Sequence, residues 1–137
     1  DYDIDDIVTE QRERFPFLHV LSFLNDADRV MLFGSTEKHY TASKTFQCLL
    51  SKRPLFSMLH EASSAYEILK ETHVEGYSYA YNENHTKHRI VDHLRPLLQS
   101  FINLKSWDVN LKPLEKYSSR ESAKKLVNCI EKVVKKS

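Results

Sequence analysis

The sequence predicts an all-α protein, a single domain over residues 1–137 made of five to seven irregularly packed helices with a tyrosine-rich loop near 75–84. Only two of the 137 residues are glycine, the residue on which tight β-turns and phosphate-binding loops depend. Apolar residues recur at helical spacing in several stretches. A hydrophobic content of 41% and a charged content of 28% are typical of a globular domain, and the chain is long enough to bury a core.

The first part of the chain is predicted to form four helices. The acidic stretch 3–14 carries aspartates where a helix begins, which suits the helix dipole. Pro16 suits the first position of a second helix, 16–24, which is apolar on nearly every side. A short third helix, 30–33, ends at the glycine that follows it. A fourth helix, 43–50, is predicted to be capped by Ser43 or Thr41.

The second part is predicted to contain three helices and one irregular segment. Residues 54–73 form the longest run with helical spacing. The segment 75–84 has partial strand alternation and is interpreted as an aromatic loop or a short hairpin arm. Helical spacing returns over 87–105, where Pro96 predicts a kink or a break. The last helix, 118–136, begins with a Ser-x-x-Glu capping box.

Charge is distributed unevenly along the chain. The formal net charge is only +1, so no overall field favours nucleic acid or a membrane. Residues 1–28 hold eight acidic and two basic side chains, a net −6, whereas residues 103–137 hold nine basic and four acidic ones, a net +5. The two ends are therefore expected to lie close together and attract each other.

The cysteines and the apolar runs bear on the compartment. Cys48 and Cys129 are the only cysteines and each has apolar neighbours, which favours free thiols over a disulfide. No apolar run approaches the length of a transmembrane helix, and no signal peptide begins the sequence. Because the first residue is aspartate, we expect a fragment or a processed form. The expected location is intracellular, cytoplasmic or nuclear.

Catalytic and metal-binding patterns are not recognisable in the sequence. His85, His88 and His93 lie close together, but a structural zinc site usually takes four ligands, and the cysteines are distant in sequence. No phosphate loop, nucleophile elbow or Cys–His signature is present. The expectation is a protein that is not an enzyme and has no catalytic residue, metal or cofactor.

The apolar stretch PFLHVLSFLNDADRVMLF, residues 16–33, must be covered either by the rest of the domain or by another protein. Pro16, the VLSFL run at 20–24, a three-residue spacer, Asp28 and the apolar run after it resemble the F-box over residues 16–40. The resemblance implies a three-helix motif that docks on a Skp1-like adaptor. The contact residues that it implies are Pro16, Leu21, Phe23, Leu24, Val30 and Leu32.

The leading functional hypothesis is a non-enzymatic protein–protein interaction module, an adaptor or scaffold domain of a larger intracellular protein with no membrane contact. The alternative is an RNA- or DNA-binding helical domain. In that alternative the basic C-terminal helix contacts phosphates and the tyrosines stack on unpaired bases. Its candidate residues are Tyr77, Tyr79, Tyr81, Lys112, Lys116, Arg120, Lys124 and Lys125.

Overall fold

The computed structural model describes residues 6–38 and 42–135. Its centre is a three-stranded parallel sheet with the strand order β1-β2-β3. The strands are β1 (Val30–Phe33), β2 (Leu55–His60) and β3 (Ser78–Tyr81). The predicted all-α class is therefore wrong, because the fold is mixed α/β. Helices still hold 51% of the described residues and strands only 11%, which explains the predominance of helical patterns in the sequence.

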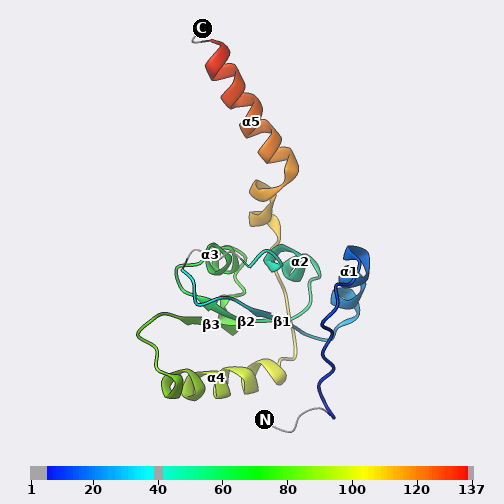
Figure 1. Ribbon diagram of the computed structural model, residues 1–137, viewed down its shortest axis with the longest axis vertical. Coiled ribbons are helices and arrows are strands. Elements are labelled where there is room, and N and C mark those ends of the chain that lie inside the picture. Colours follow the sequence, from blue (N-terminus) through cyan, green and yellow to red (C-terminus); the bar gives the residue numbers. More distant parts are fainter. Residues whose placement is uncertain (1–5, 39–41, 136–137) are drawn as a thin grey trace.

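Helices lie on both faces of the sheet and at one end of the molecule. The α-helices are α1 (Phe17–Asp26), α2 (Thr45–Leu50), α3 (Ser64–Glu71), α4 (Lys87–Ile102) and α5 (Ser119–Val134), and the 3-10 helices are η1 (Glu75–Tyr77) and η2 (Lys112–Tyr117). Figure 1 shows α2 and α3 on one face of the sheet and α4 on the other, with α1 beside α2. Both crossovers, through α2 and through α3, lie on the same face, as right-handed βαβ connections require. Helix α5 projects away from these layers.

The run 54–73, predicted as one helix, is a strand followed by a helix. Five of the six residues of β2 are buried, because this central strand has α2 and α3 on one side and α4 on the other. A parallel strand buried on both faces is apolar at nearly every position, and over six residues such a run cannot be distinguished from a buried helix by periodicity. Ser63 then caps α3 by accepting a hydrogen bond from the N–H of Tyr66 at 3.2 Å.

Neither of the two outer strands, β1 and β3, was predicted as a strand. Residues 30–33, predicted as a helix, form β1, in which Val30 and Leu32 are buried and Met31 and Phe33 are exposed. Four residues are too few for either period to be decisive. The tyrosine-rich segment 75–84 is not a loop or a hairpin arm: it contains η1 and then β3, which pairs with β2 in parallel orientation.

The hydrophobic core lies between the sheet and the α2–α3 layer. Its buried members are Val30, Leu32, Ala42, Cys48, Leu49, Leu55, Leu59, Ala65, Ile68, Leu69, Val74 and Leu114. The opposite face is packed mainly by aromatic rings, where Phe56 of β2 meets Phe101 of α4 at a centroid distance of 5.6 Å. Leu114 of η2 brings the segment after α4 back onto the α2–α3 layer, so η2 fixes the point from which α5 projects.

Further helix predictions had mixed outcomes. No helix forms over residues 6–14, and the first residues of that predicted helix lie outside the described part. Helix α4 continues through Pro96 without a break. Ser118 caps α5 by accepting a hydrogen bond from the N–H of Glu121, but the predicted capping box is only half formed, because the Ser118 N–H bonds to the carbonyl of Glu115 and the Glu121 carboxylate pairs with Lys124. The described acidic segment 6–16 and the basic α5 lie at opposite ends of the molecule (Figure 1). Within the described residues, no helix combines the length and apolar character needed to cross a membrane.

Candidate functional site

Helix α1 leaves much of its apolar surface uncovered. Pro16 is its N-cap, one position before the first helical position that the sequence predicted for it, and it makes no side-chain capping hydrogen bond. Phe17, Leu18 and Phe23 are 62%, 72% and 57% exposed. Leu24 packs against the core, but no residue of α1 is buried. The helix thus attaches to the body along one side only, and the rest of its apolar surface faces solvent.

An apolar groove runs between α1 and α2. Its volume is about 370 Å³, and its lining consists of Phe17, Leu21, Leu24, Asn25, Phe46, Gln47, Leu50 and Ser51. The guanidinium of Arg53 donates a hydrogen bond to the carbonyl of Asn25, which ties the end of α1 to the chain after α2. Leu50, on the α2 side, is 59% exposed. The groove therefore has walls from two helices held in a defined relative position.

The predicted partner-contact residues separate into two groups. Leu21 and Leu24 line the groove, while Phe23 lies elsewhere on α1 with its ring 5.1 Å from that of Phe15. Val30 and Leu32 are each only 6% exposed. They point from β1 into the core, so they stabilise the fold and offer no surface to a partner. Pro16 is exposed at the start of α1.

The groove also contains residues that the sequence did not single out as contacts. Phe46 and Leu50 come from α2 and form its second wall. Their i, i+4 spacing puts them on one helix face, which is a signal that sequence reading can find. Which face of α2 meets which face of α1, however, depends on how β1 places the two helices, and β1 was not recognised as a strand.

The tyrosines of the nucleic-acid alternative are engaged in the body of the protein. Tyr79 is only 7% exposed, and its hydroxyl lies 3.1 Å from His85 Nδ1. The Tyr77 ring packs against Phe101 and Trp107. Side chains that already pack against other rings present little free face on which a base can stack.

The basic residues of the same alternative lie along η2 and α5, away from the tyrosine strand (Figure 1). The Lys116 ammonium lies 2.6 Å from Glu71 Oε1, and the Lys124 ammonium lies 2.5 Å from Glu121 Oε1. The other three basic residues of this alternative, Lys112, Arg120 and Lys125, lie on the same two helices. The structure thus keeps the two halves of the predicted nucleic-acid surface apart.

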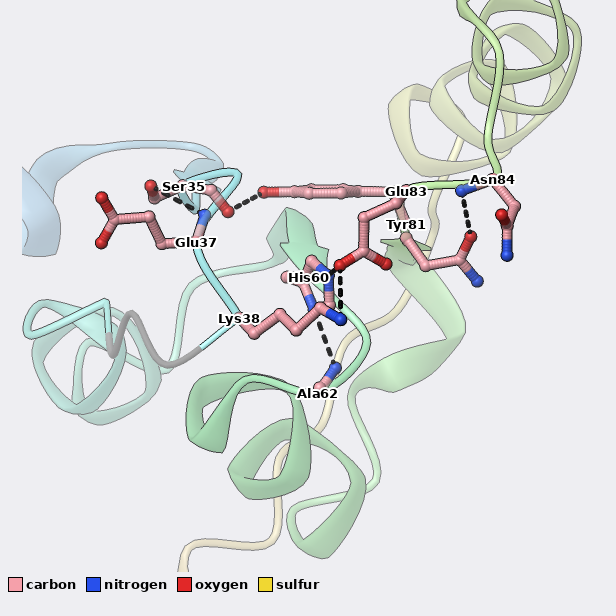
Figure 2. Close-up of polar contacts among 9 residues, drawn as sticks. Ser35, Glu37, Lys38, His60, Ala62, Tyr81, Glu83 and Asn84 are labelled. Atoms are coloured by element: carbon pink, nitrogen blue, oxygen red, sulfur yellow. Dashed lines mark hydrogen bonds and ion pairs between the residues drawn. The ribbon is translucent and has the colours of Figure 1, made fainter.

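A polar cluster lies at the carboxyl ends of the three parallel strands, where ligands bind in many open α/β sheets. Figure 2 shows Tyr81 at the end of β3 donating its hydroxyl to the carbonyl of Ser35 at 2.6 Å. His60, at the end of β2, is 3% exposed, and its Nδ1 accepts a hydrogen bond from the Ala62 N–H at 3.1 Å. The cluster was not predicted, because its members become neighbours only once the strands are recognised.

Glu83 connects the two loops of this polar cluster. One carboxylate oxygen lies 2.8 Å from the Lys38 ammonium and 3.6 Å from His60 Nε2 (Figure 2). The hydrogen bond from Lys38 lowers the pKa of Glu83 and raises that of Lys38 in return. Burial raises the pKa of the Tyr81 hydroxyl. These contacts hold the segment after β1 against the segment after β3.

The chemistry available in the polar cluster is limited by its own pairing. The Tyr81 hydroxyl is already bound to a carbonyl, and the Glu83 carboxylate is already paired with Lys38. Among the described residues, no group of three or more histidine, cysteine, aspartate or glutamate side chains could hold a metal ion. His85 and His93 both lie against Tyr79, whereas His88 pairs with Asp92. The arrangement serves to join loops, and the groove is the stronger candidate for binding.

Comparisons with known proteins leave the functional predictions untested. No protein-family model matches the chain, and the searches of curated proteins and of solved structures found no similar protein. The F-box resemblance therefore stays a prediction. Where that resemblance implies three helices, the described part of residues 16–40 forms α1 and β1.

Proposed function

We propose that this chain is a non-enzymatic protein–protein interaction module that binds an amphipathic helix of another protein in the groove between α1 and α2. The observation that carries the proposal is the groove itself, apolar, walled by two helices and continuous with the exposed Phe17. An amphipathic helix that lays its apolar face into such a groove is a recurring mode of recognition. Of the contacts that the Skp1-like docking implies, only Leu21 and Leu24 line this groove, so a Skp1-like partner would bind here through those two residues.

The surroundings of the groove support a protein partner. Monomeric proteins rarely expose several large apolar side chains together unless they form an interaction surface. Both cysteines are free, as is usual in a reducing compartment, which supports an intracellular adaptor or scaffold. Nucleic acid as the partner is less well supported, because Tyr79 is buried and the partly exposed Tyr77 already packs its ring against Phe101.

The test compares two apolar side chains of nearly equal exposure. Leu50 lines the groove and is 59% exposed, whereas Phe23 lies outside it and is 57% exposed. We expect Leu50→Asp to weaken partner binding by about 2 kcal/mol or more, about thirtyfold, because it places a charge in the apolar contact. Phe23→Asp should bind as the unchanged chain does, and circular dichroism should find both variants folded.

The measurement has two steps. First, the unchanged chain and both variants are used to capture proteins from cell extract, and mass spectrometry identifies what each one binds. A protein captured by the unchanged chain and by Phe23→Asp, but not by Leu50→Asp, is a partner that binds in the groove. A synthetic peptide from the apolar helix of one such protein should then bind the purified chain in calorimetry and gain helicity. If the peptide binds Leu50→Asp as tightly as the unchanged chain, or if only Phe23→Asp loses binding, the groove is not the binding site.

A salt titration separates the nucleic-acid alternative from the groove. Binding through phosphates weakens steeply as salt rises, whereas an apolar contact responds little. Lys124→Glu combined with Lys125→Glu should leave the binding of the protein partner unchanged. If instead the double substitution abolishes binding, and rising salt steeply weakens the binding of the unchanged chain, the basic helix is the functional surface.

A further inference from the structure

Helix α5 is amphipathic, and its apolar side is left uncovered. None of its 16 residues is buried, and it extends away from the layers of the fold (Figure 1). Four large apolar side chains share one side of this helix and are 52–67% exposed: Leu126, Val127, Ile130 and Val134. Helix α5 is therefore a helix of the kind that the groove between α1 and α2 is proposed to bind, and it belongs to the same chain.

The point from which α5 leaves the body lies at the wall of the groove. The ring of Tyr117, the last residue of η2, lies 5.3 Å from the ring of Phe46, which lines the groove. The Tyr117 hydroxyl donates to Glu71 Oε2 at 3.3 Å, and the neighbouring Lys116 ammonium lies 2.6 Å from Glu71 Oε1, so the end of η2 is anchored there. A single residue, Ser118, separates this anchored helix from α5. Helix α5 is thus tethered beside the groove by a one-residue hinge.

Helix α5 is long enough to follow the groove from this tether to its far end. The α2 wall begins at Phe46, beside the tether, and ends at Ser51, near the end of α1, because Arg53 bonds there to the carbonyl of Asn25. The α1 wall, from Phe17 to Asn25, spans about 12 Å at about 1.5 Å per residue, and α5 spans about 24 Å. A helix that turns back at the hinge therefore lays its apolar side along both walls.

Charge also favours the groove as the surface that α5 covers. Asp26 ends α1 and Asp28 follows it, and both are exposed near the far end of the groove. Lys132 lies in the last turn of α5, and Lys135 is its C-cap. Across the chain, residues 1–28 carry a net −6 and residues 103–137 a net +5, so turning back brings opposite charges together.

A second apolar depression lies on the wrong side of the sheet for this hinge. Its volume is about 580 Å³, and it lies along α4, with Val91, Leu94, Leu98 and Ile102 among its lining residues. Helix α4 covers the face of the sheet opposite to α2 and α3, whereas α5 starts on the α2–α3 side (Figure 1). Of these two apolar surfaces, the groove is the one that α5 meets by turning at Ser118.

We propose that α5 is an internal ligand of the groove, which folds back at Ser118 and competes there with the helix of a partner protein. This inference rests on the proposed function, because it names what regulates the same groove. A short tether gives α5 an effective concentration on the order of 1 mM, so an intrinsic Kd of about 0.1 mM fills the groove about tenfold over the empty state. Such a weak contact lets α5 alternate between the extended position in Figure 1 and the groove, and a partner helix displaces it.

The first test uses a synthetic peptide of residues 118–135 as the competing helix, with its binding measured by calorimetry. Leu126→Asp puts a charge on the apolar side of α5 and empties the groove, so this variant should bind the peptide at least tenfold more tightly than the unchanged chain does. Asn128→Asp puts the same charge on the polar side and should bind the peptide as the unchanged chain does. Leu50→Asp combined with Leu126→Asp should lose the gain. Equal affinity of the unchanged chain and Leu126→Asp for the peptide would overturn the proposal.

The second test locates α5 by a cross-link within one chain. Cys129 is exposed, while Cys48 is buried and burial raises the pKa of its thiol, which makes it unreactive. From the hinge to Cys129, α5 spans about 16 Å, enough to reach the far end of the groove. A short bis-maleimide should therefore join Cys129 to the cysteine introduced by Asn25→Cys, and Leu126→Asp should reduce this product at least tenfold.

The control for position is Lys70→Cys, which puts a thiol on α3, next to Glu71 and outside the groove, and should give no product. A product with Lys70→Cys and none with Asn25→Cys would mean that α5 folds onto α3 instead. A product formed only between two chains would mean that the α5 of a second copy enters the groove. Either result overturns the internal contact.

Failure of this inference is distinguishable from failure of the proposed function. Capture of outside proteins by the unchanged chain and by Phe23→Asp, but not by Leu50→Asp, supports the groove whether or not α5 enters it. If such proteins are captured while the peptide binds neither the unchanged chain nor Leu126→Asp, the groove remains a binding site and α5 is not its ligand.

Discussion

At the scale of the residue, position decides what a side chain contributes. Leu69 of α3 is 0% exposed and belongs to the core beside the sheet, whereas Leu18 of α1 is 72% exposed. Both are leucines at helical positions, and nothing in the residue type separates them. The burial of a leucine stabilises a fold by roughly 1.5–3 kcal/mol relative to leaving it exposed, so only one of these two holds the protein together.

Leu69→Ala should lower the free energy of unfolding by about 2–5 kcal/mol, because it removes buried methyl groups and leaves a cavity. Urea denaturation, followed by the fluorescence of Trp107, measures the change. The control is Leu18→Ala, which should change the free energy of unfolding by about 0.5 kcal/mol or less. Similar losses in the two variants would mean that α3 is not packed as described.

Glu83→Gln should reduce stability in a defined pH range. The pKa of Glu83 is lowered, so its contribution is complete above the ordinary value of 4.5 and is lost as pH falls through the lower folded value. The pKa of Lys38 is raised, so its contribution is complete below 10.5 and is lost as pH rises further. The melting temperatures of variant and unchanged chain should differ modestly at neutral pH and converge in strong acid.

The control for this pH series is Glu61→Gln, which removes the same charge at a nearby exposed position. It should change the melting temperature less than Glu83→Gln does at neutral pH. A difference between Glu83→Gln and the unchanged chain that persists in strong acid would mean that the ion pair with Lys38 is not its cause.

At the scale of the element, local capping and tertiary packing contribute in different proportions to the stability of α3 and of α5. Helices α3 and α5 both begin at a serine whose hydroxyl oxygen accepts a hydrogen bond from the third N–H beyond it. Helix α3 is also held by the buried Ala65, Ile68 and Leu69, whereas α5 has no buried residue. The cap is therefore a larger share of what stabilises α5, because a helix of this length is marginal in water by itself.

Ser118→Ala should destabilise α5 by about 1 kcal/mol, because its N-terminal N–H groups lose their side-chain acceptor. Far-ultraviolet circular dichroism should record a loss of helical signal while the fluorescence of Trp107 is unchanged. Ser122→Ala is the control and should leave the helical signal equal or slightly higher, since alanine favours the helix interior. Loss of the Trp107 signal would indicate that α5 is coupled to the core.

At the scale of the whole molecule, the sheet with its two helix layers forms one packed body, and α5 extends from it. The sheet is covered by α2 and α3 on one face and by α4 on the other, while α5 has contacts mainly with η2. The body should therefore unfold as one cooperative unit, and α5 should open separately from it.

Hydrogen exchange measures this separation. In dilute solution the amides of α5 should exchange faster than those of β2, whose hydrogen bonds join it to strands on both sides. Equal protection of α5 and β2 at high dilution would show that α5 is part of the cooperative body.

The sequence by itself determined where α5 begins, through the cap Ser118, and that residues 87–105, which contain α4, have helical spacing. These features are local, since the residues that make them are within one or two turns of each other. The sequence also showed that residues 16–24 are apolar. It left open whether they belong to the core or to an interface.

Tertiary structure alone decided the fold class and the site. Residues 30–33 and 55–60 are short apolar runs that fit either a buried helix or a buried strand, and they become strands because each has a strand partner beside it that is distant in sequence. The same pairing buries Val30 and Leu32 and sets α1 beside α2, which creates the groove. Both outcomes depend on contacts between residues far apart in the chain, which no local pattern records.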